Sequence, residues 1–219
     1  MGIIKDIKEE IQIIKDRDPA MHCDWEAFLY PSFRVMLSYR RAHKQYLKGH
    51  YFRARWISQR AARRTGIEIH PGAQIGKGLF IDHGNGVIIG ETTIIGDNCT
   101  LYQGVTLGGT GKEQGKRHPT IGNNVMIGAG AKVLGSCTIG DDSKIGAGSV
   151  VLCSVPSGST VVGVPGRIVR SYGEVAHPQD ALDQTDLPDP ILEAITKLQE
   201  ENKELSDRLE KLEEASNGK

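Results

Sequence analysis

A six-residue repeat in the middle of the chain limits the fold more than any other feature. Aliphatic residues recur at every sixth position between Ile69 and Val151, in three series. The series are Ile69, Ile75, Ile81, Val87; Ile89, Ile95, Leu101, Leu107; and Ile121, Ile127, Val133, Ile139, Ile145, Val151. The phase slips by two residues after the first series, and an insertion at 108–120 precedes the third.

This period fits neither an α-helix nor an alternating β-strand. It fits a prism in which each hexad forms one flat side and turns its aliphatic residue inward. Glycine often follows the aliphatic residue, as at Gly76, Gly96 and Gly128, and permits the turn at a corner. Three sides make one coil of about 18 residues, and stacked coils bury a continuous apolar column. The repeat therefore predicts a β-helix over residues 67–170.

The N-terminal flank has the pattern of a small helical domain, residues 1–66. Five isoleucines between Ile3 and Ile14 lie on one helical stripe. Residues 25–47 read as helical with a break at Pro31, and Gly49 supplies the C-cap. A further predicted helix covers 51–65 and ends at Gly66. The sequence thus predicts an α+β protein with its helices ahead of the β-helix.

The C-terminal segment, 171–219, has the pattern of a linker followed by a helix. Its apolar positions follow alternating steps of four and three, with Asn202 at an a position. These positions are Ile191, Ile195, Leu198, Asn202, Leu205, Leu209 and Leu212. The seam either joins the tails of neighbouring subunits or packs one amphipathic helix on its own subunit.

Bulk properties narrow the class of protein. The 219 residues are 25% charged and 38% hydrophobic, as in soluble globular proteins. We expect a cytoplasmic protein with four reduced cysteines, because the sequence has no signal peptide, no membrane span and no C-x-x-C pair. No acid occurs from 27 to 67, where ten Arg and Lys residues stand. We interpret this basic stretch as a solvated helical face that also pairs with acidic helices, rather than as a nucleic-acid site.

Three polar anomalies interrupt the repeat. Glu68 lies in IEIHPG, Asp82-His83 in FIDHGNG, and Arg117-His118 ends the insertion. Glu68 and His83 are fifteen residues apart, close to one coil, so we expect their side chains on adjacent rungs. A carboxylate beside an imidazole can orient it and stabilise its charged form. His83 is therefore a candidate general base with Glu68 as its orienting acid.

Several stretches resemble the serine O-acetyltransferases, a family of hexapeptide-repeat acyltransferases. They are RDPA, IEIHPGAQIG, FIDHGNG, IIGET, QGVTLGGTGK, KRHPTIG, MIGAGAKVLG, KIGAGSVV and GVPGRIV, over about residues 16–170. The resemblance implies a left-handed parallel β-helix, although the general crossover preference is right-handed. It also implies acetyl transfer from acetyl-CoA to L-serine, the first step of cysteine biosynthesis from serine.

The resemblance implies roles for particular residues. His83, Glu68 and His118 match catalytic positions, with His118 near the acceptor and the developing oxyanion. Asp18, Asp82 and Arg117 match the residues that hold the amino acid, and an Arg fork suits a carboxylate. Small and basic residues match the acetyl-CoA site: Gly109, Thr110, Ala129, Lys144 and Ala147. His70 is expected to support the turn at Pro71. No metal and no permanently bound cofactor are expected.

The resemblance also implies partners. Such enzymes are typically trimers, or dimers of trimers, with active sites between neighbouring β-helices. L-cysteine often inhibits them, and many bind O-acetylserine sulfhydrylase through a C-terminal isoleucine. This chain ends in Ser-Asn-Gly-Lys, which argues against that complex. No nucleic-acid or membrane partner is expected.

Three other functions compete with serine acetylation. An acetyltransferase for a sugar or drug hydroxyl would keep a catalytic histidine, but it would not need RDPA or the Asp82-His83 and Arg117-His118 pairs. A γ-class carbonic anhydrase would need a third histidine shortly after His118, where Asn123 and Asn124 stand. A scaffolding trimer would tolerate the loss of Glu68, His83 and His118.

Overall fold

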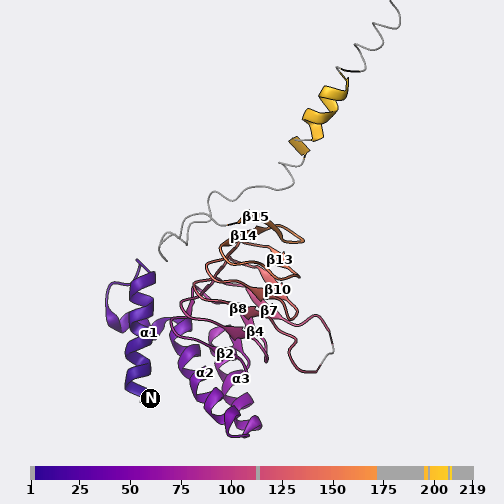
Figure 1. Cartoon of the computed structure of the whole chain (residues 1–219). Helices are drawn as coiled ribbons and strands as arrows, with labels where there is room; N and C mark the ends of the chain where they lie inside the picture. Colours follow the sequence, from indigo (N-terminus) through magenta and orange to yellow (C-terminus); the bar gives the residue numbers. More distant parts are fainter. Residues whose placement is uncertain (1–2, 112–113, 172–194, 197, 207, 209–219) are drawn as a thin grey trace, which may run out of the picture. The chain divides into compact units, whose positions relative to one another are not determined.

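The computed structural model describes residues 3–111, 114–171, 195–196, 198–206 and 208. The chain divides into two compact units, Met1–Asp186 and Leu187–Lys219, and each is described by itself. The first unit contains helices followed by a left-handed parallel β-helix, so the predicted α+β fold class is confirmed (Figure 1).

Short strands of the described residues form the three sides of the β-helix. They are β1 (Glu68–Ile69), β2 (Gln74–Ile75), β3 (Phe80–Ile81), β4 (Ile88–Ile89), β5 (Ile94–Ile95), β6 (Thr100–Leu101), β7 (Thr106–Gly108), β8 (Thr120–Ile121), β9 (Met126–Ile127), β10 (Lys132–Leu134), β11 (Thr138–Ile139), β12 (Lys144–Ile145), β13 (Val150–Val151), β14 (Ser159–Val162) and β15 (Arg167–Ser171). Sheet 1 has the order β1-β4-β7-β10-β13 and sheet 2 the order β2-β5-β8-β11. Sheet 3 has the order β3-β6-β9-β12-β14-β15, and its last pair is antiparallel.

The repeated aliphatic residues stack into columns inside the coils. In sheet 1 the register places Ile69 beside Ile89, Ile89 beside Leu107, and Leu107 beside Val133. Each of these side chains is at most 2% exposed. Burying one such side chain contributes about 1.5–3 kcal/mol. The hexad pattern is therefore the core of the fold.

The two-residue phase slip is an enlarged corner. Residues 82–87 connect β3 to β4, whereas residues 102–105 make the same connection one coil later. His83 lies in this enlarged corner with φ 55°, a left-handed conformation that few non-glycine residues adopt. The slip thus lifts His83 out of the regular coil. We call this connection between sheets 3 and 1 the His83 corner.

The long insertion enlarges a different corner. It connects β7 of sheet 1 to β8 of sheet 2 and ends at Arg117-His118. In the previous coil, residues 90–93 make the same connection between β4 and β5. We call this connection between sheets 1 and 2 the His118 corner.

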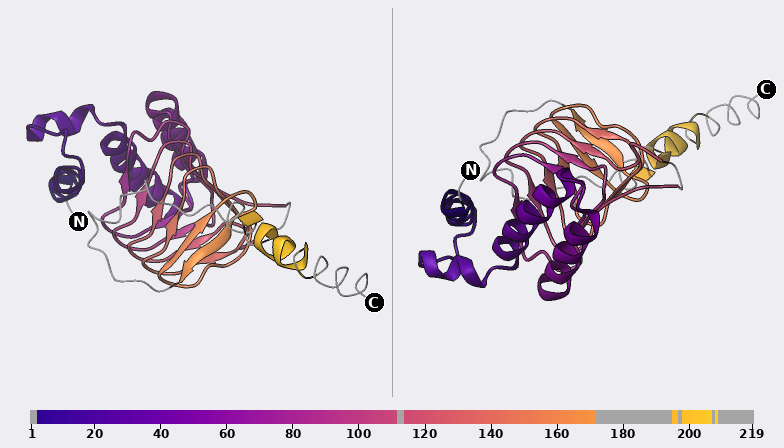
Figure 2. Two further views of the ribbon diagram at one scale, coloured as in Figure 1. Left: turned by 90° about the horizontal axis from the view of Figure 1, so that it is seen from above. Right: turned by 90° about the horizontal axis from the view of Figure 1, so that it is seen from below.

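The helices follow the predicted pattern closely. They are α1 (Ile3–Arg17), the 3-10 helix η1 (Asp24–Leu29), α2 (Pro31–Leu47) and α3 (Tyr51–Thr65). Pro31 is the first residue of α2, and Gly66 ends α3 in the left-handed conformation. α2 and α3 lie side by side at the end of the β-helix where the first coil begins (Figures 1 and 2).

Part of the basic stretch pairs with an acidic helix, in agreement with the interpretation from sequence. Arg40 of α2 lies 3.1 Å from Asp6, 3.5 Å from Glu9 and 2.6 Å from Glu10, all on α1. Glu10 is buried, and its burial raises its pKa to about 7 despite the opposing effect of Arg40. One guanidinium therefore faces three carboxyl groups where α1 packs on α2.

We expect Glu10→Gln to stabilise the protein at pH 8 and to have little effect near pH 4. The folded-state pKa of Glu10 lies above the unfolded value, so its contribution to stability is present below pH 4.5 and is lost as pH rises through about 7. The shift corresponds to at most roughly 3 kcal/mol. Unfolding by denaturant at both pH values measures the difference. Asp24→Asn, which changes an exposed carboxylate, is the control; equal effects of the two variants would contradict the prediction.

In the second unit, residues 195–196, 198–206 and 208 are helical. Ile195, Leu198 and Leu205 of the predicted seam are 46%, 64% and 59% exposed. Ile191, Leu209 and Leu212 lie outside the described residues, so the seam stays a prediction. Within the described ranges, no helix is long and apolar enough to cross a membrane.

Candidate active site

His83 is presented to solvent at its corner. Its side chain is 76% exposed, and Nε2 lies 4.0 Å from a carboxylate oxygen of Asp82. The enlarged corner leaves the imidazole free of packing contacts that would bury it. A free imidazole beside a carboxylate has the geometry that a general base needs.

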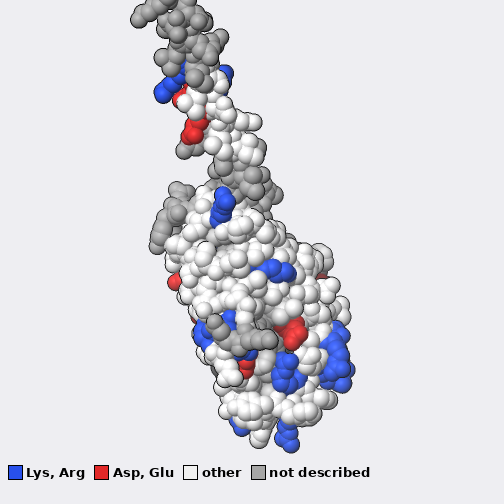
Figure 3. Space-filling model, turned by 90° about the vertical axis from the view of Figure 1, so that its right-hand side faces the viewer, with Lys and Arg blue, Asp and Glu red and all other residues white. Residues whose placement is uncertain are grey.

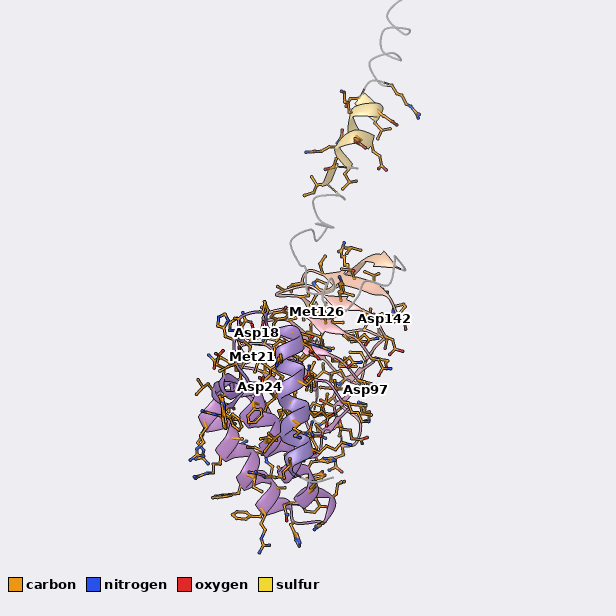
Figure 4. All side chains as sticks on the ribbon, turned by 90° about the vertical axis from the view of Figure 1, so that its left-hand side faces the viewer. Asp18, Met21, Asp24, Asp97, Met126 and Asp142 are labelled. Carbon is orange, nitrogen blue, oxygen red and sulfur yellow. The ribbon has the colours of Figure 1, made fainter. Side chains whose placement is uncertain are left out.

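Asp18 reaches the same corner from the N-terminal helices. Arg17 anchors this end of α1 on the β-helix by donating to Thr100 Oγ1 at 2.6 Å and to the carbonyl oxygen of Asn98 at 3.2 Å. Asp18 follows immediately (Figure 4) and accepts hydrogen bonds from the Tyr30 hydroxyl at 2.7 Å and the Ala20 N–H at 2.8 Å. The RDPA motif thus docks α1 and orients a carboxylate.

The Asp18 charge acts on the neighbouring carboxyl group of Asp82. Burial raises the pKa of Asp82, and the Asp18 charge raises it further, while His83 lowers it. Burial and the hydrogen bond to Asp18 raise the pKa of Tyr30 to about 12, so its hydroxyl stays protonated and donates. Two neighbouring carboxylates form a site that suits a cation such as an ammonium group.

Glu68 lies beside the His83 corner but its carboxylate turns elsewhere. The backbone N–H of Glu68 donates to the carbonyl of Val87, so the two rungs are adjacent as expected. The Glu68 carboxylate accepts from Gln59 at 3.1 Å and lies 3.9 Å from Arg55, both on α3. Among the described residues, no hydrogen bond or ion pair joins Glu68 to His83, and Asp82 is the acid paired with His83. The orienting role of Glu68 stays a prediction.

Arg117 is held at the His118 corner by an acid that the sequence analysis did not single out. Its guanidinium donates to Glu91 Oε2 at 2.5 Å, and the Tyr46 hydroxyl of α2 donates to Glu91 Oε1 at 3.0 Å. The hydrogen bond from Arg117 lowers the pKa of Glu91. Figure 3 shows the face that contains the insertion, with Lys and Arg side chains gathered toward the end formed by α2 and α3.

His118 is enclosed, in contrast to His83. It is 9% exposed, and its ring lies directly over Gly90 in the coil below. Thr92 contacts the ring through both its backbone N–H and its hydroxyl. Burial lowers the pKa of His118, and the charges of Arg117 and Lys116 lower it further.

The residues expected at the acetyl-CoA site also divide between the two corners. Ala129 and Ala147 follow β9 and β12 on the His83 side, and the N–H of Gly148 donates to the carbonyl of Ala129. Gly109 and Thr110 follow β7 on the His118 side and are exposed. Lys144 begins β12 in sheet 3.

Within one chain, the residues at the His83 corner do not come together with those at the His118 corner. His83 precedes β4 and the His118 ring lies over Gly90, which follows β4, so the whole of sheet 1 separates them. One side of a coil is a nearly extended segment of about six residues, which places the corners roughly 15–20 Å apart. Asp18, Asp82 and His83 lie at one edge of sheet 1, and Arg117 and His118 at the other.

The structure adds residues that sequence reasoning missed. Tyr30 contacts Asp18, and Glu91 and Thr92 hold Arg117 and His118. Glu91 and Thr92 lie in the motif IIGET, which was noted only as part of the family resemblance. His70 accepts a hydrogen bond from the Gly72 N–H on Nδ1, which fits its expected support of the turn.

Comparison with known proteins places the chain among described enzymes. Residues 118–162 match the family model "Bacterial transferase hexapeptide (six repeats)". The serine acetyltransferase of Staphylococcus xylosus is 54% identical over 199 residues, which are 90% of this chain and 91% of that protein.

Solved structures agree. The Neisseria gonorrhoeae serine acetyltransferase in complex with serine is 43% identical, with a TM-score of 0.73 over 77% of this chain and 69% of that one. The Brucella abortus enzyme in complex with coenzyme A is 44% identical, with a TM-score of 0.74 over 78% and 68%. A serine acetyltransferase in complex with cysteine is 41% identical, with a TM-score of 0.79 over 84% and 72%.

Proposed function

The chain belongs to the serine acetyltransferases, and we propose that it moves the acetyl group of acetyl-CoA onto the L-serine hydroxyl at sites built by two neighbouring copies. The products are O-acetyl-L-serine and CoA, and the reaction is the first step of cysteine biosynthesis from serine. Relatives in complex with serine and with coenzyme A support both substrates.

The observation that carries the proposal is the division of the site between two corners. Sheet 1 separates His83 from His118 within a chain, but the His118 corner of one copy can face the His83 corner of the next. Such a contact joins two different surfaces, and it closes into a ring when three copies are related by a threefold axis. We propose a homotrimer, or a dimer of trimers, with the acetyl-CoA residues on the same boundary.

The proposed chemistry assigns one task to each group. The carboxylates of Asp18 and Asp82 bind the serine ammonium, and the Arg117 guanidinium of the neighbouring copy binds the carboxylate. His83 takes the hydroxyl proton as the serine oxygen attacks the thioester carbonyl. In this proposal the Glu68 carboxylate, which contacts Gln59 and Arg55 in the single chain, turns toward His83 to orient the imidazole. The tetrahedral intermediate then expels the CoA thiolate, which takes the proton back from His83. His118 lies near the oxygen that becomes negative.

The proposed acetyl-CoA site is lined mainly by small residues. Glycine has no side chain and alanine has only a methyl group. The thin pantetheine arm can therefore approach the backbone at Gly109, Ala129 and Ala147. Thr110 lies beside Gly135 and contributes to the same surface. Lys144 supplies a positive charge for the phosphates.

Release of free CoA thiol from acetyl-CoA tests the reaction. We expect release that depends on L-serine, with much lower rates for homoserine, a sugar or buffer. A rate that does not depend on serine would reject the acceptor, and faster release with a sugar would favour an acetyltransferase for sugar hydroxyls.

Subunit mixing tests the shared site. His83→Ala and His118→Ala should each be nearly inactive, but trimers reassembled from equal amounts should recover about a quarter of the wild-type activity. The recovery arises because some boundaries then combine an intact His83 with an intact His118. Mixed trimers as inactive as the parents would indicate that both histidines act within one chain.

We also propose that L-cysteine competes with L-serine for this site. Cysteine has the same ammonium and carboxylate groups, so Asp18, Asp82 and Arg117 can bind it equally well. The relative in complex with cysteine supports this proposal.

A further inference from the structure

In the described part of the chain, the hydrogen-bond contacts of the His118 ring come from a single residue, Thr92, and they go to the same ring nitrogen. The Thr92 backbone N–H points at His118 Nδ1 from 3.2 Å, and the Thr92 hydroxyl oxygen lies 2.9 Å from the same atom. Nε2 has no hydrogen-bond partner among the described residues. The two ring nitrogens therefore differ in what they can do.

The Thr92 hydroxyl oxygen is itself saturated as an acceptor. It accepts the backbone N–H groups of Arg117 and of His118, each at 3.1 Å. A hydroxyl has two lone pairs and one proton, so both lone pairs are used and only the proton remains for Nδ1. The Thr92 N–H is a second donor to Nδ1, and it cannot face a protonated nitrogen. Both contacts require Nδ1 to be without a proton.

We propose that Thr92 is a positioning residue that holds neutral His118 with its proton on Nε2, so that His118 acts as a hydrogen-bond donor and not as a base. The inference deepens the proposed function, on which its catalytic part rests. In the reaction, the Nε2–H donates to the oxygen that becomes negative in the tetrahedral intermediate. Proton abstraction then belongs to His83 alone.

The charges around His118 favour the same state. Burial, Arg117 and Lys116 lower its pKa, and only Glu91 raises it. Glu91 is already engaged by Arg117. The neighbouring His70 also accepts a hydrogen bond on its Nδ1. An imidazolium at His118 would need a proton on Nδ1, facing the Thr92 N–H.

Nitrogen NMR of the full-length enzyme with ¹⁵N-labelled histidine tests the tautomer without any substrate. The His118 signals are those that disappear in His118→Gln. We expect a pyrrole-type signal for Nε2 and a pyridine-type signal for Nδ1 between pH 7 and pH 8. A pyrrole-type Nδ1, or an imidazolium at pH 7, would overturn the proposal even if the enzyme acetylates serine.

Two substitutions at Thr92 test its role. Thr92→Ser keeps the hydroxyl and should keep both the NMR signature and kcat. Thr92→Val has nearly the same shape and keeps the backbone N–H, but it lacks the hydroxyl, which makes three hydrogen bonds here. We expect the His118 Nδ1 signal to shift, because one of its two contacts is lost, and kcat to fall at least tenfold. An unchanged His118 spectrum in folded Thr92→Val would reject the Thr92 hydroxyl as a group that positions His118.

Activity of two His118 variants tests the donor role. The glutamine side-chain amide can place an N–H near the position of Nε2, whereas alanine has no donor. A donor role predicts that His118→Gln is at least tenfold more active than His118→Ala. Equal loss in both variants, with a shifted acidic limb of the pH profile, would indicate that His118 is a base.

Discussion

Replacing His83 with alanine should lower kcat for acetyl transfer to L-serine by about 10²–10⁴-fold, the usual contribution of a general base. The imidazole is largely exposed and lies in an enlarged corner, so its removal takes no packing from the core. The KM for acetyl-CoA should change little, because the proposed role of His83 is to take the proton of the serine hydroxyl. Thiol release under saturating substrates measures the effect.

Backbone strain needs its own control in this experiment. His83 has φ 55°, and alanine in that conformation costs on the order of 1–2 kcal/mol. Asparagine adopts this conformation more readily, so His83→Asn should be as inactive as His83→Ala but nearer to the wild type in stability. His50→Ala, an exposed histidine before α3, should keep full activity. Activity within tenfold of the wild type in His83→Asn would show that His83 is not the base.

Gly90→Ala should reduce activity by at least 10²-fold, although Gly90 makes no contact with substrate in the proposed site. A Cβ atom at this position would lie 1.9 Å from Cδ2 and 2.2 Å from Nε2 of His118. The imidazole must then leave its place over the coil and lose both contacts to Thr92. Misplacing a catalytic group by about 1 Å is enough for a loss of this size.

The next coil offers a matched control for Gly90. Gly108 occupies the same rung position, because its neighbour Leu107 pairs with Ile89. A Cβ at Gly108 would meet only side-chain methyl groups, the nearest being Leu134 Cδ2 at 3.0 Å. We expect Gly108→Ala to keep most of the activity and the wild-type oligomeric state. If both variants lost activity equally, the effect would come from the coil and not from His118.

The architecture followed from the sequence because it is a periodic structure. A β-helix repeats one packing solution, so an aliphatic residue at every sixth position is enough to specify its buried column. The helix ends could also be predicted from the local sequence. Pro31 begins α2 and Gly66 ends α3, because both residue types have strong backbone preferences. Handedness came only from the family resemblance, since the hexad pattern has no hand.

The phase slip shows where local reasoning stopped. The two extra residues before Ile89 are visible in the sequence, but the repeat pattern did not predict their structural effect. The structure shows that they enlarge one corner and expose His83. Similarly, Tyr30 and Thr92 are ordinary residues in sequence, and only the docking of α1 and the stacking of coils place them against Asp18 and His118.

The sequence by itself determined the coil, the helical domain and the two histidines that interrupt the repeat, because each depends on neighbours within a few residues. Only the tertiary structure decided that His83 and His118 lie at opposite edges of sheet 1, and that Glu68 turns to α3. Those outcomes depend on which corner each insertion enlarges and on how helices pack against coils. They depend on contacts between residues 9 to 83 positions apart in the sequence, and no local pattern encodes them.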